Sequence, residues 1–201
     1  MPELQEKIKI WVAETNKYVW QLRKNLSKKH FFIIAMLILL FILLKYNIKA
    51  VAVVTFLGLL ASYSTMYKRY LKIPSAVELV TFGTVIVSIT VGPTAGAFFG
   101  AITTLASEII SASVDIFTFL YVFARAVIGF MAWHLYTQLQ LSVPTVGIIS
   151  ALTFILIAAP FYLLPGDFEA KLKVIYFFIV NLGINIIVFT MLGDLVVNFI
   201  L

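Results

Sequence analysis

The sequence predicts an all-α fold, a polytopic transmembrane helix bundle of six to seven spans that follows an amphipathic N-terminal helix. Hydrophobic residues make up 62% of the 201 positions and charged residues only 12%, and the mean hydropathy is +1.06. Soluble domains of this length do not need so much apolar surface. The basic residues are concentrated between the apolar runs, as at membrane boundaries. We expect residues 1–30 to form the amphipathic helix and residues 31–201 the bundle, in the cell membrane.

Several classes of chemistry lack the residues that they require. The chain has no Cys and two His, which excludes disulfides and thiolate metal sites and argues against a His-rich metal site. It contains no H-E-x-x-H, no G-x-S-x-G and no Gly-rich nucleotide loop followed by Lys, so the common hydrolase and nucleotide-binding motifs are missing. We therefore expect no catalysis, no cofactor and no metal. The formal net charge of +6 is interpreted as setting membrane orientation, with no nucleic-acid partner.

The N-terminal segment, residues 3–26, has the spacing of a one-sided helix. Its apolar side chains favour one face and its lysines and arginines the remainder. With Trp11 and Trp20 present, this pattern is typical of a helix lying in the lipid headgroup layer. The alternative is a short helix that binds a partner protein.

Two short apolar runs follow, residues 31–44 and 50–67. Each lies near the lower limit of about 17 residues for a span, which flanking Lys and Tyr can extend by reaching to the interface. Tyr67, Lys68, Arg69 and Tyr70 then form an aromatic and basic band.

The stretch from 73 to 113 organises the bundle, because two apolar segments meet in it at Gly92-Pro93. Pro is tolerated in the first turn of a helix but not in its middle, so this dipeptide predicts a tight helical hairpin. Small residues recur every four positions behind it and permit close backbone approach between membrane helices. The predicted packing residues are Gly92, Pro93, Gly96, Ala97, Gly100 and Ala101. A packing seam by itself explains the glycines.

Carboxylates flank the hairpin. Ser75 and Glu78 match the capping pattern Ser-x-x-Glu before a helix starting at Ala76, and a ligand or ion role is the alternative for Glu78. The helix after the turn, from Thr94 to about Ser111, carries Thr103, Thr104, Ser107 and Glu108 in its second half. Asp115 starts the next helix, where a carboxylate favours the helix dipole.

Arg125 lies in the middle of the predicted span 116–136. A cation at this depth is costly unless it is paired or faces a polar cavity. Glu108 is the nearest deep carboxylate along the chain, so we expect Arg125 to point into the bundle and pair with Glu108. The pair can serve a ligand or be purely structural.

The last two spans are residues 144–164, kinked by Pro160, and residues 174–196. Asn181 and Asn185 lie four apart and therefore on one face, typical of hydrogen bonds to a neighbouring helix. The candidate substrate-binding residues are Glu78, Glu108, Arg125, Asn181 and Asn185.

Loop charges predict the orientation. With seven spans, the N-terminal segment and the basic loops at 68–72 and 171–173 lie on one side, and Lys45 and Lys49 on the other. The positive-inside rule places the N-terminus in the cytoplasm.

A sequence of features runs from Tyr70 to Tyr136, about a third of the chain: Ile73-Pro74, then Gly92-Pro93-Thr94-Ala95-Gly96-Ala97-Phe98-Phe99-Gly100, then Arg125 with Gly129. This order resembles the substrate-binding (S) components of energy-coupling factor transporters and the related membrane protein MreD. The resemblance implies a bundle of six helices that captures a vitamin-like molecule from outside and docks on a membrane partner subunit driven by ATPases. It also implies that the loop at 68–72 lies outside.

Three functions follow as expectations. The first is an S-component-like subunit that binds or takes up a small molecule without catalysis of its own. The second is an MreD-like scaffold for other membrane proteins, and the third an ion-coupled carrier that uses Glu108 and Arg125. A polar cavity lined by Glu108, Arg125 and Asn181 favours uptake or ion coupling. A filled core with an exposed Gly/Ala face favours the scaffold.

Overall fold

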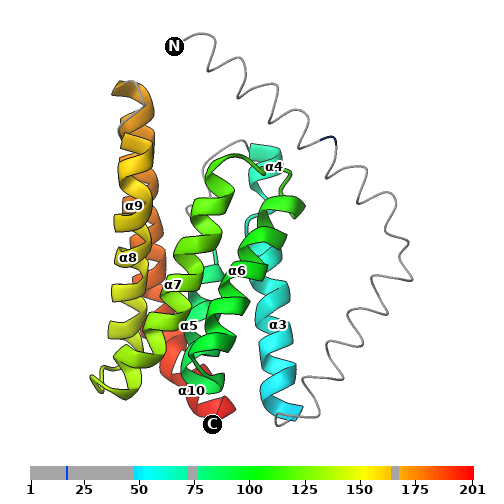
Figure 1. The fold of residues 1–201 in the computed structure, drawn as a ribbon, viewed down its shortest axis with the longest axis vertical. Helices are drawn as coiled ribbons and strands as arrows, with labels where there is room; N and C mark the ends of the chain where they lie inside the picture. The colour runs from blue at the N-terminus through cyan, green and yellow to red at the C-terminus, as the bar shows by residue number, and fades with distance from the viewer. Residues whose placement is uncertain (1–16, 18–47, 72–76, 164–167) are drawn as a thin grey trace.

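The computed structural model describes residue 17 and residues 48–71, 77–163 and 168–201, and within these ranges it is helical with no strand (Figure 1). The all-α prediction is therefore confirmed. The predicted amphipathic helix, apart from Lys17, and the apolar run 31–44 lie outside the described residues. The elements are α3 (Ile48–Ser64), α4 (Lys68–Leu71), α5 (Val80–Val91), α6 (Pro93–Ile110), α7 (Phe117–Thr137), α8 (Val143–Leu163), α9 (Phe168–Val188), the π-helix η1 (Phe189–Gly193) and α10 (Asp194–Ile200).

Four helical stretches in the described residues are long and apolar enough to cross a membrane: Lys49–Tyr70, Phe117–Thr137, Val143–Phe161 and Val174–Ile200. They are compatible with a multi-pass membrane protein. Helix α5 is also apolar but has 12 residues, fewer than a full span needs. The count of six to seven spans stays a prediction.

Helix α5 is the centre of the bundle. Ten of its 12 residues are buried, and it packs against α3, α6, α7 and α8. A helix that is apolar on all sides suits such an enclosed position. The predicted start at Ala76 is wrong, because α5 begins at Val80 and leaves Glu78 in the segment before it.

The turn between α5 and α6 forms as predicted. Gly92 has φ +131°, a backbone conformation that residues with a Cβ rarely adopt, and Pro93 is the first residue of α6. A Cβ at Gly92 would meet no atom within 4 Å. The backbone conformation, and not lack of space, therefore requires glycine here.

The small-residue ladder of α6 lies inside the bundle, as predicted for Gly96 and Gly100. A Cβ added at Gly96 would lie 2.7 Å from the backbone Cα of Ser88 on α5, and one at Gly100 would lie 2.9 Å from the carbonyl oxygen of Arg125 on α7. Ser88 Oγ in turn donates a hydrogen bond of 2.5 Å to the carbonyl oxygen of Gly129. Helices α5, α6 and α7 are thus joined at backbone distance.

Ala97 and Ala101 are half-buried. The backbone of Ala97 nevertheless lies in the tightest contact of this seam, because a Cβ at Gly129 of α7 would overlap the carbonyl carbon of Gly96 and the backbone nitrogen of Ala97. Gly129 is not among the packing residues predicted from the small-residue spacing, and only the family resemblance includes it.

The C-terminal helices close the end of the bundle opposite α4 (Figure 1). The chain continues from α9 through the π-helix η1 into α10. Phe189, the first residue of η1, is fully buried, and its ring lies 5.2 Å from that of Phe82 on α5. At the same end, Lys49 Nζ lies 4.6 Å from the ring centre of Phe199. The start of α3 and the C-terminus therefore meet.

Candidate functional site

A buried ion pair joins Arg125 on α7 to Glu78, with 2.8 Å between Nη2 and Oε1. The two side chains are 5% and 4% exposed. The prediction that Arg125 points into the bundle is confirmed, and the prediction that it pairs with Glu108 is wrong. Arg125 also stacks on Phe154 of α8, with Cζ 3.9 Å from the ring centre, a cation–π geometry.

The position of Glu78 beside the start of α5 explains this partner. Arg125 lies eight residues after Phe117, the first residue of α7, which is about 12 Å along the helix. Glu78 lies two residues before Val80, the first residue of α5, and its side chain meets Arg125 at that level of α7.

Glu78 is both the cap of α5 and the anion of the pair. Oε2 accepts hydrogen bonds from the backbone N–H of Val80 at 2.6 Å and of Thr81 at 3.1 Å. Oε1 accepts from Thr81 Oγ1 at 2.6 Å and Asn181 Nδ2 at 3.4 Å, besides Arg125. Arg125 Nη1 donates to the same Thr81 hydroxyl. A buried carboxylate with this many donors is fully satisfied.

A second ion pair lies beside the first. Lys68 Nζ of α4 is 2.8 Å from Glu108 Oε1 of α6, and the side chains are 12% and 7% exposed. Ser113 Oγ donates to Glu108 Oε2 at 2.5 Å. The predicted candidate Glu108 is therefore paired, but with a residue that the sequence analysis assigned to the interfacial band.

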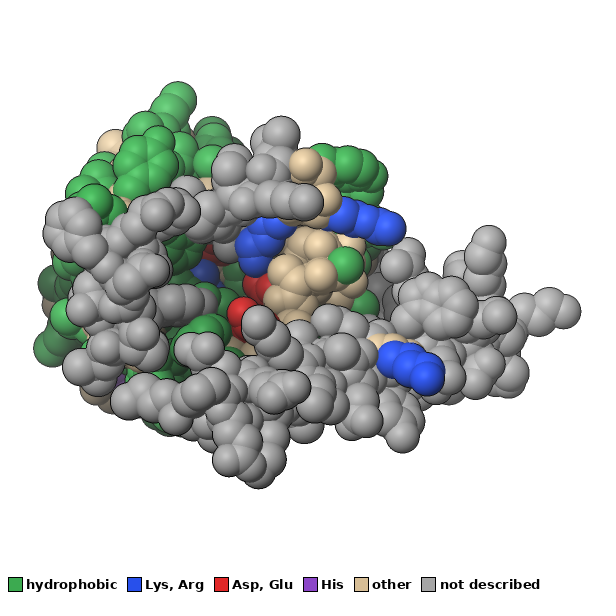
Figure 2. Space-filling view, turned by 90° about the horizontal axis from the view of Figure 1, so that it is seen from above, with side chains coloured by type: hydrophobic (Ala, Val, Ile, Leu, Met, Phe, Trp, Pro, Cys, Tyr) green, Lys and Arg blue, Asp and Glu red, His purple; other side chains and the backbone are tan. Residues whose placement is uncertain are grey.

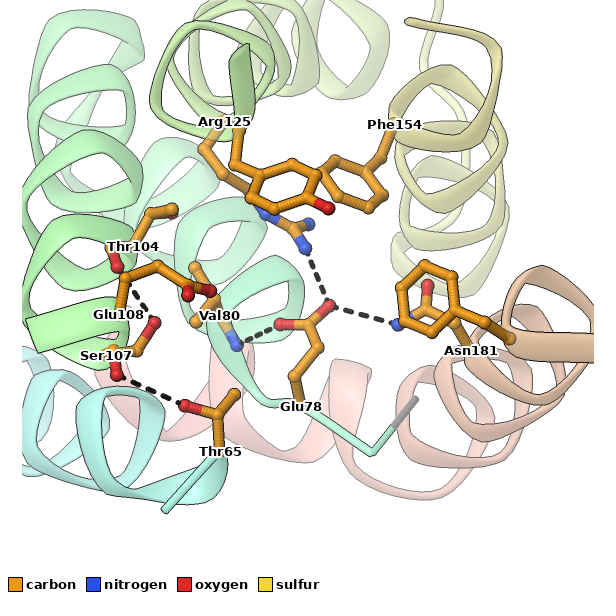
Figure 3. A pocket seen from close by; sticks show the side chains of 11 residues that line it. Thr65, Glu78, Val80, Thr104, Ser107, Glu108, Arg125, Phe154 and Asn181 are labelled. Atoms are coloured by element: carbon orange, nitrogen blue, oxygen red, sulfur yellow. Dashed lines mark hydrogen bonds and ion pairs between the residues drawn. The ribbon is translucent and has the colours of Figure 1, made fainter. Parts of the chain in front are cut away.

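Glu78, Arg125 and Glu108 from the two pairs line one cavity of about 30 Å³ (Figure 3). This volume holds one or two water molecules. In Figure 3 the Glu78 carboxylate lies between Arg125 and Asn181, and Glu108 points toward the same space from α6. The other lining residues are Thr65, Val80, Thr104, Ser107, Tyr121, Phe154 and Phe177.

Acidic and basic side chains are visible near the centre of the molecule in the view onto the end that carries α4 (Figure 2). Lys68 belongs to α4 and Ser113 to the α6–α7 connection, so the Glu108 pair is on this side of the cavity.

Asn181 and Asn185 share a buried face of α9, as predicted. Asn181 reaches across to Glu78, whereas Asn185 Nδ2 donates to the carbonyl oxygen of Asn181 at 2.9 Å. Asn185 does not line the cavity and instead supports Asn181. The structure thus brings Glu78, Glu108, Arg125 and Asn181 together. Sequence reasoning missed the aromatic wall, because Tyr121, Phe154 and Phe177 match the general apolar pattern of their helices.

Asp115 caps α7, as predicted. Its Oδ1 accepts hydrogen bonds from the backbone N–H of Phe117 at 2.9 Å and of Thr118 at 3.0 Å. Partial burial raises the pKa of this carboxyl above its ordinary value of 3.8, and the negative charge of Glu108 adds to the increase. The ionised form is therefore less favourable in the folded protein than in the unfolded chain.

Asp115→Asn is accordingly expected to keep the cap and to raise stability at neutral pH. A raised folded-state pKa means that the wild type loses stability as the pH rises from the ordinary aspartate value through the raised one. Asn caps helices about as well as Asp, so the advantage of the variant disappears in acid. Thermal unfolding of both proteins from about pH 4 to 8 measures this. Asp194→Asn, at an exposed position, is the control for loss of a carboxylate. A larger gain in stability of Asp115→Asn in acid than at neutral pH would contradict the expectation.

No protein family model, curated protein or solved structure matches this chain. Its function is therefore inferred from the geometry of the cavity.

Proposed function

We propose that this chain is a multi-pass cell-membrane protein that binds a small polar solute in the cavity between its helices, as a binding or uptake subunit without catalysis of its own. One observation carries the proposal: Glu78, Arg125 and Glu108 line the same cavity, and Lys68 pairs with Glu108 beside it. Ionisable groups inside a membrane bundle are costly and typically mark solute or ion pathways. Docking on a membrane partner subunit, as in the S components that the sequence resembles, is part of the proposal.

An ion-coupled carrier is the second candidate. It is favoured by Glu108, whose carboxylate lies 2.8 Å from Lys68 near the α4 end, where a proton or ion can reach it from that side. The scaffold function has less support. The scaffold requires an exposed Gly/Ala face, whereas Gly96 and Gly100 are occupied by contacts within the bundle.

Native mass spectrometry of the gently purified protein is the first test. We expect a retained small solute, released on activation, because the lining groups gain hydrogen bonds from it in a water-poor site. Glu108→Gln should lose the extra mass, and Lys49→Met, at the opposite end, should keep it. If wild type and variants all show the bare protein mass, and no solute in a broad panel raises the Tm, the binding function is contradicted.

Orientation decides which compartment supplies the solute. The chain has no Cys, so single cysteines report cleanly at two exposed positions, Val77 near the cavity end and Gln138 at the opposite end. The loop charges predict that Gln138→Cys is labelled by an impermeant reagent in intact cells and Val77→Cys only after permeabilisation. The opposite pattern supports the orientation implied by the S-component resemblance, with the cavity end outside. Equal labelling of both contradicts a fixed topology.

A further inference from the structure

The wall of the cavity formed by α6 offers hydrogen-bond acceptors. Thr104 Oγ1 donates to the carbonyl oxygen of Gly100 at 2.6 Å, and Ser107 Oγ to that of Thr104 at 2.8 Å. A hydroxyl has one proton and two lone pairs, so both oxygens retain acceptor capacity. Glu108 lies on the same wall, and its carboxylate, which can accept about four hydrogen bonds, has Lys68 and Ser113 as donors.

The opposite wall offers donors. The Arg125 guanidinium carries five N–H groups, and among the described residues it donates to Thr81 and Glu78. Glu78 is not a competing ligand for an incoming cation, because five donors already occupy its oxygens. One wall therefore offers the positively charged N–H donors of Arg125, and the other offers the negatively charged acceptor oxygens of Glu108.

Within the described part of the chain, the charges of the two ion pairs cancel, because Glu78 faces Arg125 and Glu108 faces Lys68. Glu78 and Glu108 contribute two negative charges, and Lys68 and Arg125 two positive ones. A solute with net charge would leave one charge unbalanced in a low-dielectric site, which is strongly unfavourable. A solute that is neutral overall, but carries a donor at one end and an acceptor at the other, matches both walls.

We propose that the ligand is a small zwitterion of the amino-acid class, with its carboxylate on Arg125 and its ammonium on Glu108 and the hydroxyl oxygens of Thr104 and Ser107. This inference rests on the proposed function and specifies its substrate class. The cavity of about 30 Å³ holds one or two waters and favours the smallest members; glycine, with five non-hydrogen atoms, already requires its walls to move apart. Larger side chains must displace the aromatic wall of Phe154 and Phe177.

The test measures thermal stabilisation and equilibrium dialysis of the full chain in lipid nanodiscs with glycine, acetate and methylammonium as probes. Glycine is expected to raise the Tm in a saturable way, and the two singly charged probes are not. Glu108→Gln leaves the site with one extra positive charge, so its preference should switch. We expect glycine binding to weaken by about tenfold or more and acetate binding to appear. A gain of acetate binding cannot result from misfolding.

Thr104→Val removes a hydrogen-bond acceptor without changing the shape of the side chain, and it is expected to weaken glycine binding by up to about tenfold. Thr90→Val is its matched control, because Thr90 Oγ1 makes the same type of bond, to the carbonyl oxygen of Ile86 at 2.8 Å, away from the cavity.

Stabilisation by acetate, methylammonium or uncharged solutes such as urea, but not by glycine, overturns the zwitterion proposal and leaves the binding function standing. Unchanged selectivity in Glu108→Gln also overturns it. No response to any solute overturns both proposals.

Discussion

Arg125→Met is expected to lower the free energy of unfolding by about 3–5 kcal/mol, the usual cost of removing one partner of a buried ion pair. The loss leaves Glu78 ionised in a site where it is 4% exposed, with Thr81, Asn181 and the α5 backbone as its remaining donors. Reversible unfolding in mixed micelles, or the Tm in nanodiscs, measures the effect. The exposed Arg69→Met is the matched control and should change stability little.

A double-mutant cycle identifies the partner. Glu78→Gln alone is also expected to destabilise, because it leaves Arg125 unpaired and places an amide among donors. The double variant of Arg125 and Glu78 should recover part of the summed loss, since no buried charge is left over. In the corresponding cycle of Arg125→Met with Glu108→Gln, the two losses of stability should be close to additive. Stronger coupling of Arg125 to Glu108 than to Glu78 would contradict the observed pairing.

Gly96→Leu is expected to be the most disruptive change in the seam between α5 and α6. An added Cβ would lie 2.5 Å from Ser88 Cβ and 2.7 Å from Ser88 Cα, so the collision is with backbone as well as side chain. Overpacking costs typically about 1–3 kcal/mol, and more where backbone must shift. We expect a large drop in Tm or failure to assemble a folded bundle, measured by size-exclusion chromatography and thermal unfolding.

Gly183→Ala is the matched control, because a Cβ at this position of α9 meets nothing within 4 Å. Ala favours a helix over Gly by up to about 1 kcal/mol in a helix interior, so this variant should be neutral or stabilised. Unchanged stability and oligomeric state in Gly96→Leu would show that the ladder is not a close contact. Gly96→Leu should also disturb the cavity, because the next glycine of the ladder, Gly100, holds α6 against the backbone of Arg125.

The sequence by itself determined the helical class and the features that depend on local chemistry. Gly92-Pro93 predicted the turn because a positive φ and a first-turn proline are backbone properties. The cost of a membrane-embedded cation predicted that Arg125 points inward, and the spacing of Asn181 and Asn185 placed both on one face. Each of these predictions needs only the nearest residues and the solvent.

Only the tertiary structure decided which charges meet. Glu108 is closer to Arg125 along the chain, but Glu78 is its partner because the start of α5 packs beside the middle of α7. Lys68, which the sequence assigned to the interface, reaches Glu108 because α4 lies over the end of α6. Helix depth and side-chain reach are set by packing among helices distant in sequence, and no local pattern encodes them.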